Sequence, residues 1–60
     1  MQENMPKDPV MLLSFINLKL RDYYHNLDAL CASLEISKEA LVRKLETIDY
    51  AYDPDTNQFI

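Results

Sequence analysis

The sequence has 60 residues, 48% of them hydrophobic, with a single cysteine and a net charge of −4 at neutral pH. This length allows one small domain without a second core, and one cysteine excludes an internal disulfide. No apolar run approaches the length of a membrane-spanning helix and no signal-peptide core follows Met1, so we expect a soluble, cytoplasmic protein. We expect a single domain over residues 1–60, with residues 1–7 as a flexible N-terminal segment.

The charge is unevenly distributed along the chain. In residues 1–25 the acidic and basic residues balance, whereas residues 26–60 carry the whole excess of acid. Nonspecific affinity for nucleic acid comes chiefly from Lys and Arg, which neutralise phosphates. The acidic second half therefore counts against a polyanionic partner.

A first helix is predicted over residues 9–23. Asp8 can cap it, and Pro9 stands at the first helical position, where its missing N–H group costs nothing. Apolar residues follow at three- and four-residue spacings, and Phe15 and Leu18 widen the stripe beyond a third of the circumference. So broad a face indicates contact with two elements, or with one element and a partner chain.

Two more helices are predicted over residues 27–35 and 38–48. Asn26 and Ser37 are the expected N-caps. The connection between these helices is a tight turn, in which Glu35 stands where helix-turn-helix proteins usually have glycine. A left-handed Glu35 would cost about 1 kcal/mol relative to glycine, so either tertiary packing offsets that cost or the turn has another geometry.

After Ile48 the apolar period shortens from about 3.6 residues to 2, which is typical of a strand. We expect a hairpin with strands at residues 50–52 and 58–60, joined by the turn Asp53-Pro54-Asp55-Thr56-Asn57. The predicted fold class is thus α+β: three helices with a helix-turn-helix, followed by a short β-hairpin in the manner of a miniature winged helix. The apolar spacing predicts a core of Leu12, Leu13, Ile16, Leu20, Leu27, Leu30, Cys31, Leu34, Ile36, Leu41, Leu45, Ile48, Tyr50 and Phe59.

Two stretches at the ends, NMPKDPVMLLSFINLKLRD and YAYDPDTNQF, resemble a family of short bacterial proteins known as domain of unknown function 4250. The resemblance covers residues 4–59 and implies a free-standing small protein, without implying an activity, ligand or catalytic residue. The chain also resembles the wider helix-turn-helix superfamily. That resemblance is carried by Leu30, Cys31, Leu34, Ile36, Ser37, Leu41 and Leu45, which are structural positions and indicate no ligand.

Four residues of the third predicted helix and its cap are candidate contacts to nucleic acid: Ser37, Lys38, Arg43 and Lys44. Lysine and arginine there could bind phosphates or base edges. Glu39 and Val42 share the same face, however, and the hairpin offers aspartates without a cation. We therefore keep a DNA-binding accessory or regulatory protein as the alternative function.

The sequence gives little support to a metal site or to catalysis. Asp53, Asp55 and Asn57 match the first oxygen positions of an EF-hand loop, but Gln58 replaces its glycine and the chain lacks the final glutamate. The single histidine, His25, is expected in a loop, and Cys31 is expected inside the helix crossing, where a thiol is inert. We expect no enzyme, cofactor or metal. The leading hypothesis is a small module that binds another protein or a second copy of itself.

Overall fold

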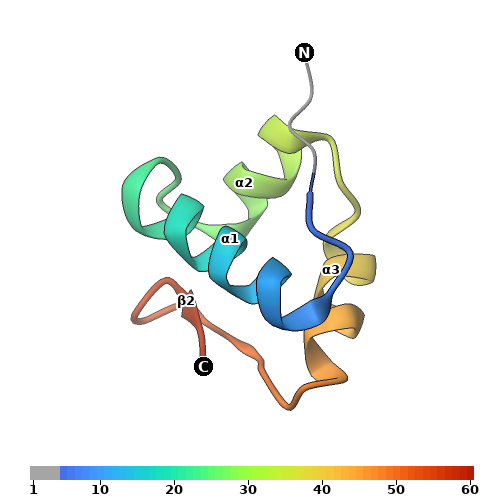
Figure 1. Cartoon of the computed structure of the whole chain (residues 1–60). Helices are drawn as coiled ribbons and strands as arrows, with labels where there is room; N and C mark the ends of the chain where they lie inside the picture. Colours follow the sequence, from blue (N-terminus) through green and yellow to red (C-terminus); the bar gives the residue numbers. More distant parts are fainter. Residues whose placement is uncertain (1–4) are drawn as a thin grey trace.

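The computed structural model describes residues 5–60, so the predicted flexibility of residues 1–4 lies outside the described part. It contains three helices, α1 (Pro9–Asp22), α2 (Leu27–Leu34) and α3 (Lys38–Glu46), followed by strands β1 (Tyr52–Asp53) and β2 (Gln58–Phe59). The two strands pair antiparallel, with Tyr52 opposite Phe59. This order confirms the predicted α+β fold. In Figure 1, α1 crosses the middle of the molecule with α2 above it, α3 to its right and the hairpin below.

All three helices begin at the predicted caps. The side chains of Asp8, Asn26 and Ser37 accept hydrogen bonds from the backbone N–H groups of Met11, Ala29 and Ala40. Each cap satisfies a donor that has no partner within the helix itself. Local sequence therefore determines where these helices start.

The predicted helices extend too far at their C-terminal ends, by one residue in α1 and α2 and by two residues in α3. In α3 the excess has a clear cause. The N–H groups of Thr47, Ile48 and Asp49 donate to carbonyls three residues back, so the last turn tightens beyond Glu46. Asp49 then takes a left-handed conformation at φ 63° and turns the chain away.

Glu35 is left-handed, at φ 56° and ψ 47°. The turn therefore keeps the backbone geometry expected of a helix-turn-helix, and has no other one. The N–H groups of Glu35 and Ile36 both donate to the carbonyl of Cys31, which closes the end of α2. The chain thus reproduces the usual glycine geometry without glycine.

The strand boundaries were also misplaced. Tyr50 was predicted in the first strand, but its N–H group donates to the carbonyl of Leu45 and is not free for the ladder. Ala51 and Ile60 exchange two backbone hydrogen bonds of 2.9 Å. From this pair toward the turn, the residues of β1 lie opposite those of β2. The rings of Tyr52 and Phe59 lie 5.6 Å apart and face the helices as a cross-strand pair.

The core lies where α1 meets α2, α3 and β2. Nine predicted core residues are buried: Leu12, Ile16, Leu20, Leu27, Leu30, Cys31, Leu41, Leu45 and Phe59. The prediction of burial was wrong for Leu13, Leu34, Ile36, Ile48 and Tyr50, which are half-buried and pack against the outside of this core. A domain of this size has too much surface for its volume to enclose them.

Candidate protein-interaction surface

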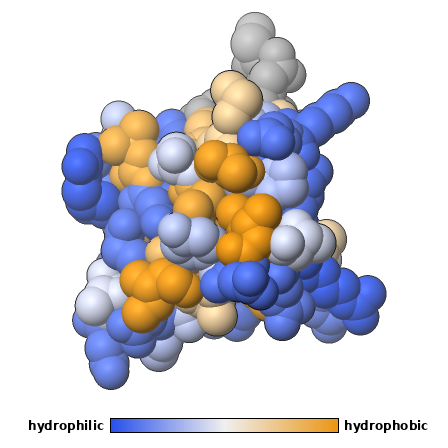
Figure 2. Space-filling model, turned by 60° about the horizontal axis from the view of Figure 1, so that its bottom comes forward, coloured by the Kyte–Doolittle hydropathy of each residue, from blue (hydrophilic) through white to orange (hydrophobic). Residues whose placement is uncertain are grey.

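The solvent side of α1 carries exposed apolar residues. Val10, Met11 and Leu18 are 58%, 62% and 45% exposed, although Leu12, Ile16 and Leu20 on the opposite side are buried in the core. With Ser14 and Arg21, which are also exposed and share this side, they form what we call the outer face of α1. Figure 2 shows hydrophobic side chains gathered in the middle of the face seen from below Figure 1, with hydrophilic residues around them.

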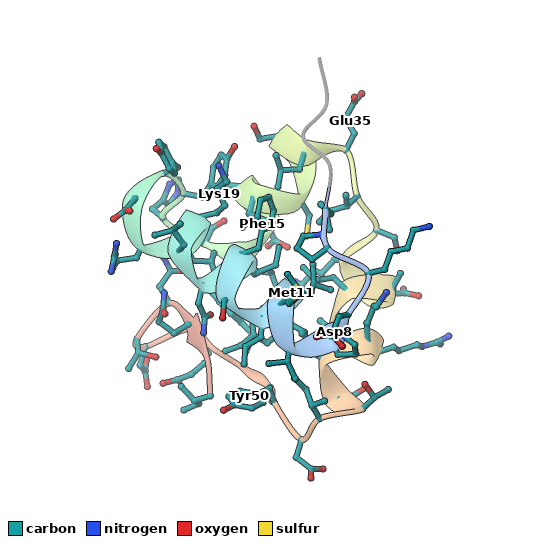
Figure 3. The ribbon with its side chains drawn as sticks, viewed as in Figure 1. Asp8, Met11, Phe15, Lys19, Glu35 and Tyr50 are labelled. Carbon is teal, nitrogen blue, oxygen red and sulfur yellow. The ribbon has the colours of Figure 1, made fainter. Side chains whose placement is uncertain are left out.

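One flank of the outer face is aromatic. Met11, Phe15 and Lys19 follow one another along α1 (Figure 3), and Tyr23 continues the same four-residue spacing. The Lys19 ammonium nitrogen lies 5.3 Å from the centre of the Phe15 ring and 4.8 Å from that of Tyr23. Such contacts let the lysine stem cover apolar surface while its charge stays hydrated.

The end of the outer face is charged. Arg21 donates through Nε and Nη2 to the two carboxylate oxygens of Asp22, at 2.9 and 3.1 Å. This hydrogen-bonded pair raises the pKa of Arg21 and lowers that of Asp22. Both side chains are exposed, so the pair contributes little to stability.

The four candidate nucleic-acid contacts do not share one environment. The Ser37 hydroxyl oxygen accepts the capping hydrogen bond from the Ala40 N–H, and Lys38 forms a 2.8 Å salt bridge with Asp28, which raises the pKa of Lys38. Lys44 is half-buried and lines a pocket with the N-terminal segment. Arg43 remains exposed on the outer side of α3, where it lines a shallow hollow with Glu39, Val42 and Glu46.

The hairpin adds further acid and no cation. Asp53 organises its turn by accepting hydrogen bonds from the backbone of Asp55 and the hydroxyl of Thr56. Within residues 5–60, no group of three or more His, Cys, Asp or Glu side chains is placed to hold a metal ion. None of the helices described is long and apolar enough to cross a bilayer.

A protein-family model, Domain of unknown function (DUF4250), matches residues 6–59. The chain belongs to the DUF4250 family. This match confirms the resemblance drawn from the two ends of the sequence, whereas the wider helix-turn-helix resemblance stays a prediction. No curated protein and no solved structure matches this DUF4250 chain.

Only part of the outer face of α1 in this DUF4250 protein is predictable from the breadth of the apolar stripe. The breadth of the apolar stripe on the first helix pointed to Phe15 and Leu18, but Val10 and Met11 were not singled out. A usable signal existed: Met11 and Leu18 are seven residues apart, which is two helical turns and places them on one side.

Proposed function

We propose that this protein is a non-enzymatic interaction module, and that the outer face of α1 binds a second copy of the chain. The observation that carries the proposal is the exposure of Val10, Met11 and Leu18 on a helix that already buries its other side in the core. A helix with apolar residues on both sides is typical of a helix that is covered on both sides.

The spacing of the exposed residues suits an antiparallel pair of α1 helices. A two-fold axis between Ser14 and Phe15 would set Met11 of each copy against Leu18 of the other. Both copies then use the same patch, as in the commonest class of homodimer. Ser14 at the centre is small, so it allows the two helices to approach closely.

The same register brings opposite charges together at both ends of the helix pair. Asp8 of one copy would lie at the same level along the pair as Arg21 of the other, and the long Arg21 side chain would reach it by extending across the face toward Asp22, as it does within one copy. Asp8 uses Oδ2 to cap α1, which leaves Oδ1 available, and Arg21 keeps Nη1 beyond its bonds to Asp22. Exposed ion pairs add little affinity, but they favour one register and orientation over others.

The DNA-binding alternative has less support from the geometry. Of the four candidate contacts, Lys38 is paired with Asp28. The hollow around Arg43 contains two glutamates. Phosphate would meet as many negative as positive groups along this side of α3.

Sedimentation velocity over a range of protein concentrations tests the proposal. We expect a monomer at low micromolar concentration and a rising fraction of dimer toward millimolar concentration. The double variant Met11→Glu/Leu18→Glu should stay monomeric throughout, because a dimer would bury four carboxylates. A wild-type chain that remains monomeric at millimolar concentration would contradict the proposal.

A matched control separates the site from the added charge. Ala32 on α2 and Ala51 before β1 are both exposed. The variant Ala32→Glu/Ala51→Glu adds the same two negative charges away from the outer face of α1, so it should dimerise like the wild type. Circular dichroism of both variants confirms that each is folded.

A further inference from the structure

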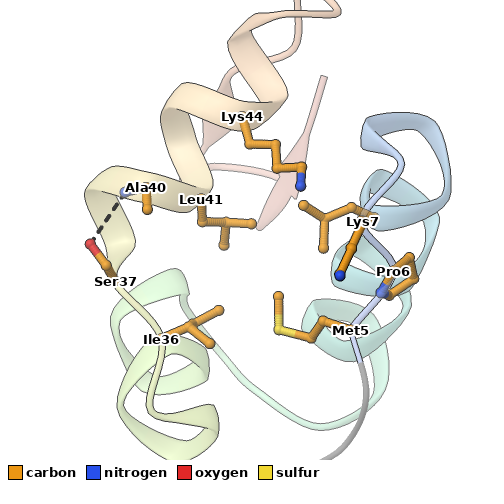
Figure 4. Close-up of a pocket in the computed structure, with 9 residues that line it drawn as sticks. Met5, Pro6, Lys7, Ile36, Ser37, Ala40, Leu41 and Lys44 are labelled. Carbon is orange, nitrogen blue, oxygen red and sulfur yellow. Dashed lines mark hydrogen bonds between the residues drawn. The ribbon is translucent and has the colours of Figure 1, made fainter.

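A pocket of about 260 Å³ lies between the N-terminal segment and α3, as Figure 4 shows. Met5 and Pro6 form one wall, and Ile36, Ala40 and Leu41 form the other. Leu12, on the buried side of α1, also lines the pocket. The lining is therefore mainly aliphatic.

Two lysines complete the pocket. Lys7 comes from the N-terminal segment and Lys44 from α3, and in Figure 4 both side chains extend toward the pocket. Neither ammonium group forms a salt bridge with another described residue. In a chain with a net charge of −4, two cations beside one apolar hollow make a local site of the opposite sign.

We propose that this pocket binds a small carboxylic acid with a short apolar body, such as an alkyl chain or a single aromatic ring. The apolar body would replace water against Met5, Leu12 and Leu41, and the carboxylate would lie at the rim between Lys7 and Lys44. Ligand pockets usually have volumes of roughly 300–1,000 Å³, so this pocket of about 260 Å³ lies just below that range and suits only a small ligand. The lining provides no carboxylate that would repel the ligand.

This site is independent of the proposed self-association. The residue of α1 that lines the pocket, Leu12, lies on the side of α1 opposite the outer face, and neither Met11 nor Leu18 lines the pocket. A chain that stays monomeric could still bind the acid, and a dimer could form without it.

The test uses octanoate as the probe, with octylamine and acetate for comparison, and follows backbone amide shifts of the full chain by ¹H–¹⁵N NMR. We expect saturable shifts with octanoate that centre on residues 36–41 and on Lys7. Octylamine has an alkyl chain of similar length and the opposite charge, and acetate has the charge without the chain, so both should bind much more weakly.

Variants assign the binding to the pocket. The double variant Lys7→Gln/Lys44→Gln should weaken octanoate binding about fourfold or more, since each lysine contributes one partly exposed ion pair. Arg43→Gln removes the neighbouring cation of α3, which does not line the pocket, and should leave the affinity unchanged. Ala40→Leu fills the pocket and should abolish octanoate binding. Ala32→Leu, at an exposed position of α2 outside the pocket, should not.

Three results would overturn the proposal. One is the absence of saturable octanoate shifts at millimolar concentration in the folded wild-type chain. Another is equal binding of octylamine and octanoate, which would show that the lysines recognise no charge. The third is wild-type affinity in the double lysine variant, whose NMR spectrum also reports whether it is folded.

Discussion

The side-chain amide of Asn17 exchanges two hydrogen bonds with the backbone of Phe59. Phe59 N–H donates to Asn17 Oδ1 at 2.8 Å, and Asn17 Nδ2 donates to the Phe59 carbonyl at 3.1 Å. Because Ala51 and Ile60 exchange the neighbouring ladder bonds, the polar groups of Phe59 point away from β1. Asn17 thus acts as a substitute for the missing third strand and fixes β2 onto α1.

Replacing Asn17 should cost more stability than its half-buried position suggests. Asn17→Ala removes both hydrogen bonds and leaves the Phe59 N–H and carbonyl without a protein partner, so we expect a loss of about 2 kcal/mol. Urea unfolding followed by circular dichroism measures it. Ser14→Ala, an exposed change on the same helix, should cost less than about 0.5 kcal/mol. A loss that small for Asn17→Ala would mean that the hairpin does not depend on this contact.

Glycine at position 35 should stabilise the fold. Glu35 is left-handed, and glycine adopts this conformation without the Cβ clash, so Glu35→Gly should raise the free energy of unfolding by about 0.5–1 kcal/mol. Glu39→Gly is the matched control, because Glu39 lies in the first turn of α3, where glycine is unfavourable. Thermal unfolding of the two variants should shift in opposite directions, and a destabilised Glu35→Gly would refute the strain argument.

The Cys31 thiol should be unreactive in the folded chain. Burial is the main cause that raises its pKa above the ordinary value of 9.0, with the nearby charge of Asp28 adding to it. The thiolate needed for reaction is thus both scarce and inaccessible. We expect labelling by a disulfide reagent at pH 8 to be at least about tenfold slower in native buffer than in denaturant. Equal rates would place Cys31 at the surface.

The raised pKa of Cys31 also predicts how the stability of the fold changes with pH. The folded chain holds the thiol proton of Cys31 more tightly than the unfolded chain does. The contribution of this proton to the free energy of unfolding is therefore fully present below pH 9.0 and is lost as the pH rises through the raised pKa. The variant Cys31→Ala should not show this additional loss of stability above pH 9.0. An identical decline in both proteins would assign the effect to other groups.

DNA should bind weakly or not at all. The second half of the chain carries the net acid, and the positive groups of α3 are interspersed with Glu39 and Glu46. Fluorescence anisotropy with a labelled duplex at low salt, where electrostatic attraction is strongest, should show no binding in the micromolar range. Saturable binding that Lys38→Ala/Arg43→Ala abolishes would instead support the DNA-binding alternative.

The sequence predicted the features that depend on neighbouring residues. The caps Asp8, Asn26 and Ser37 satisfy N–H groups three positions away, and the buried residues of α1 follow one helical period. These patterns lie within a few residues, so they can be found without a structure.

Contacts between distant parts of the chain could not be predicted in this way. Asn57, left-handed at φ 56°, donates to the carbonyls of Leu20 and Tyr24 and accepts a hydrogen bond from the Tyr52 hydroxyl. The sequence places Asn57 in the hairpin turn, and nothing local indicates the end of α1 as its partner. The pocket beside Lys7 and Lys44 likewise depends on where the N-terminal segment lies against α3.

The antiparallel pairing of α1 is tested most directly by mixing two single variants, Met11→Cys and Leu18→Cys, under mild oxidation. Cys31 is buried, so the introduced thiol is the accessible one in each protein. Antiparallel packing places residue 11 of one copy against residue 18 of the other, within the distance that a disulfide spans. Mass spectrometry should show that the mixed Met11→Cys–Leu18→Cys dimer forms much faster than either homodimer. Homodimers and mixed dimers in statistical proportion would contradict the account.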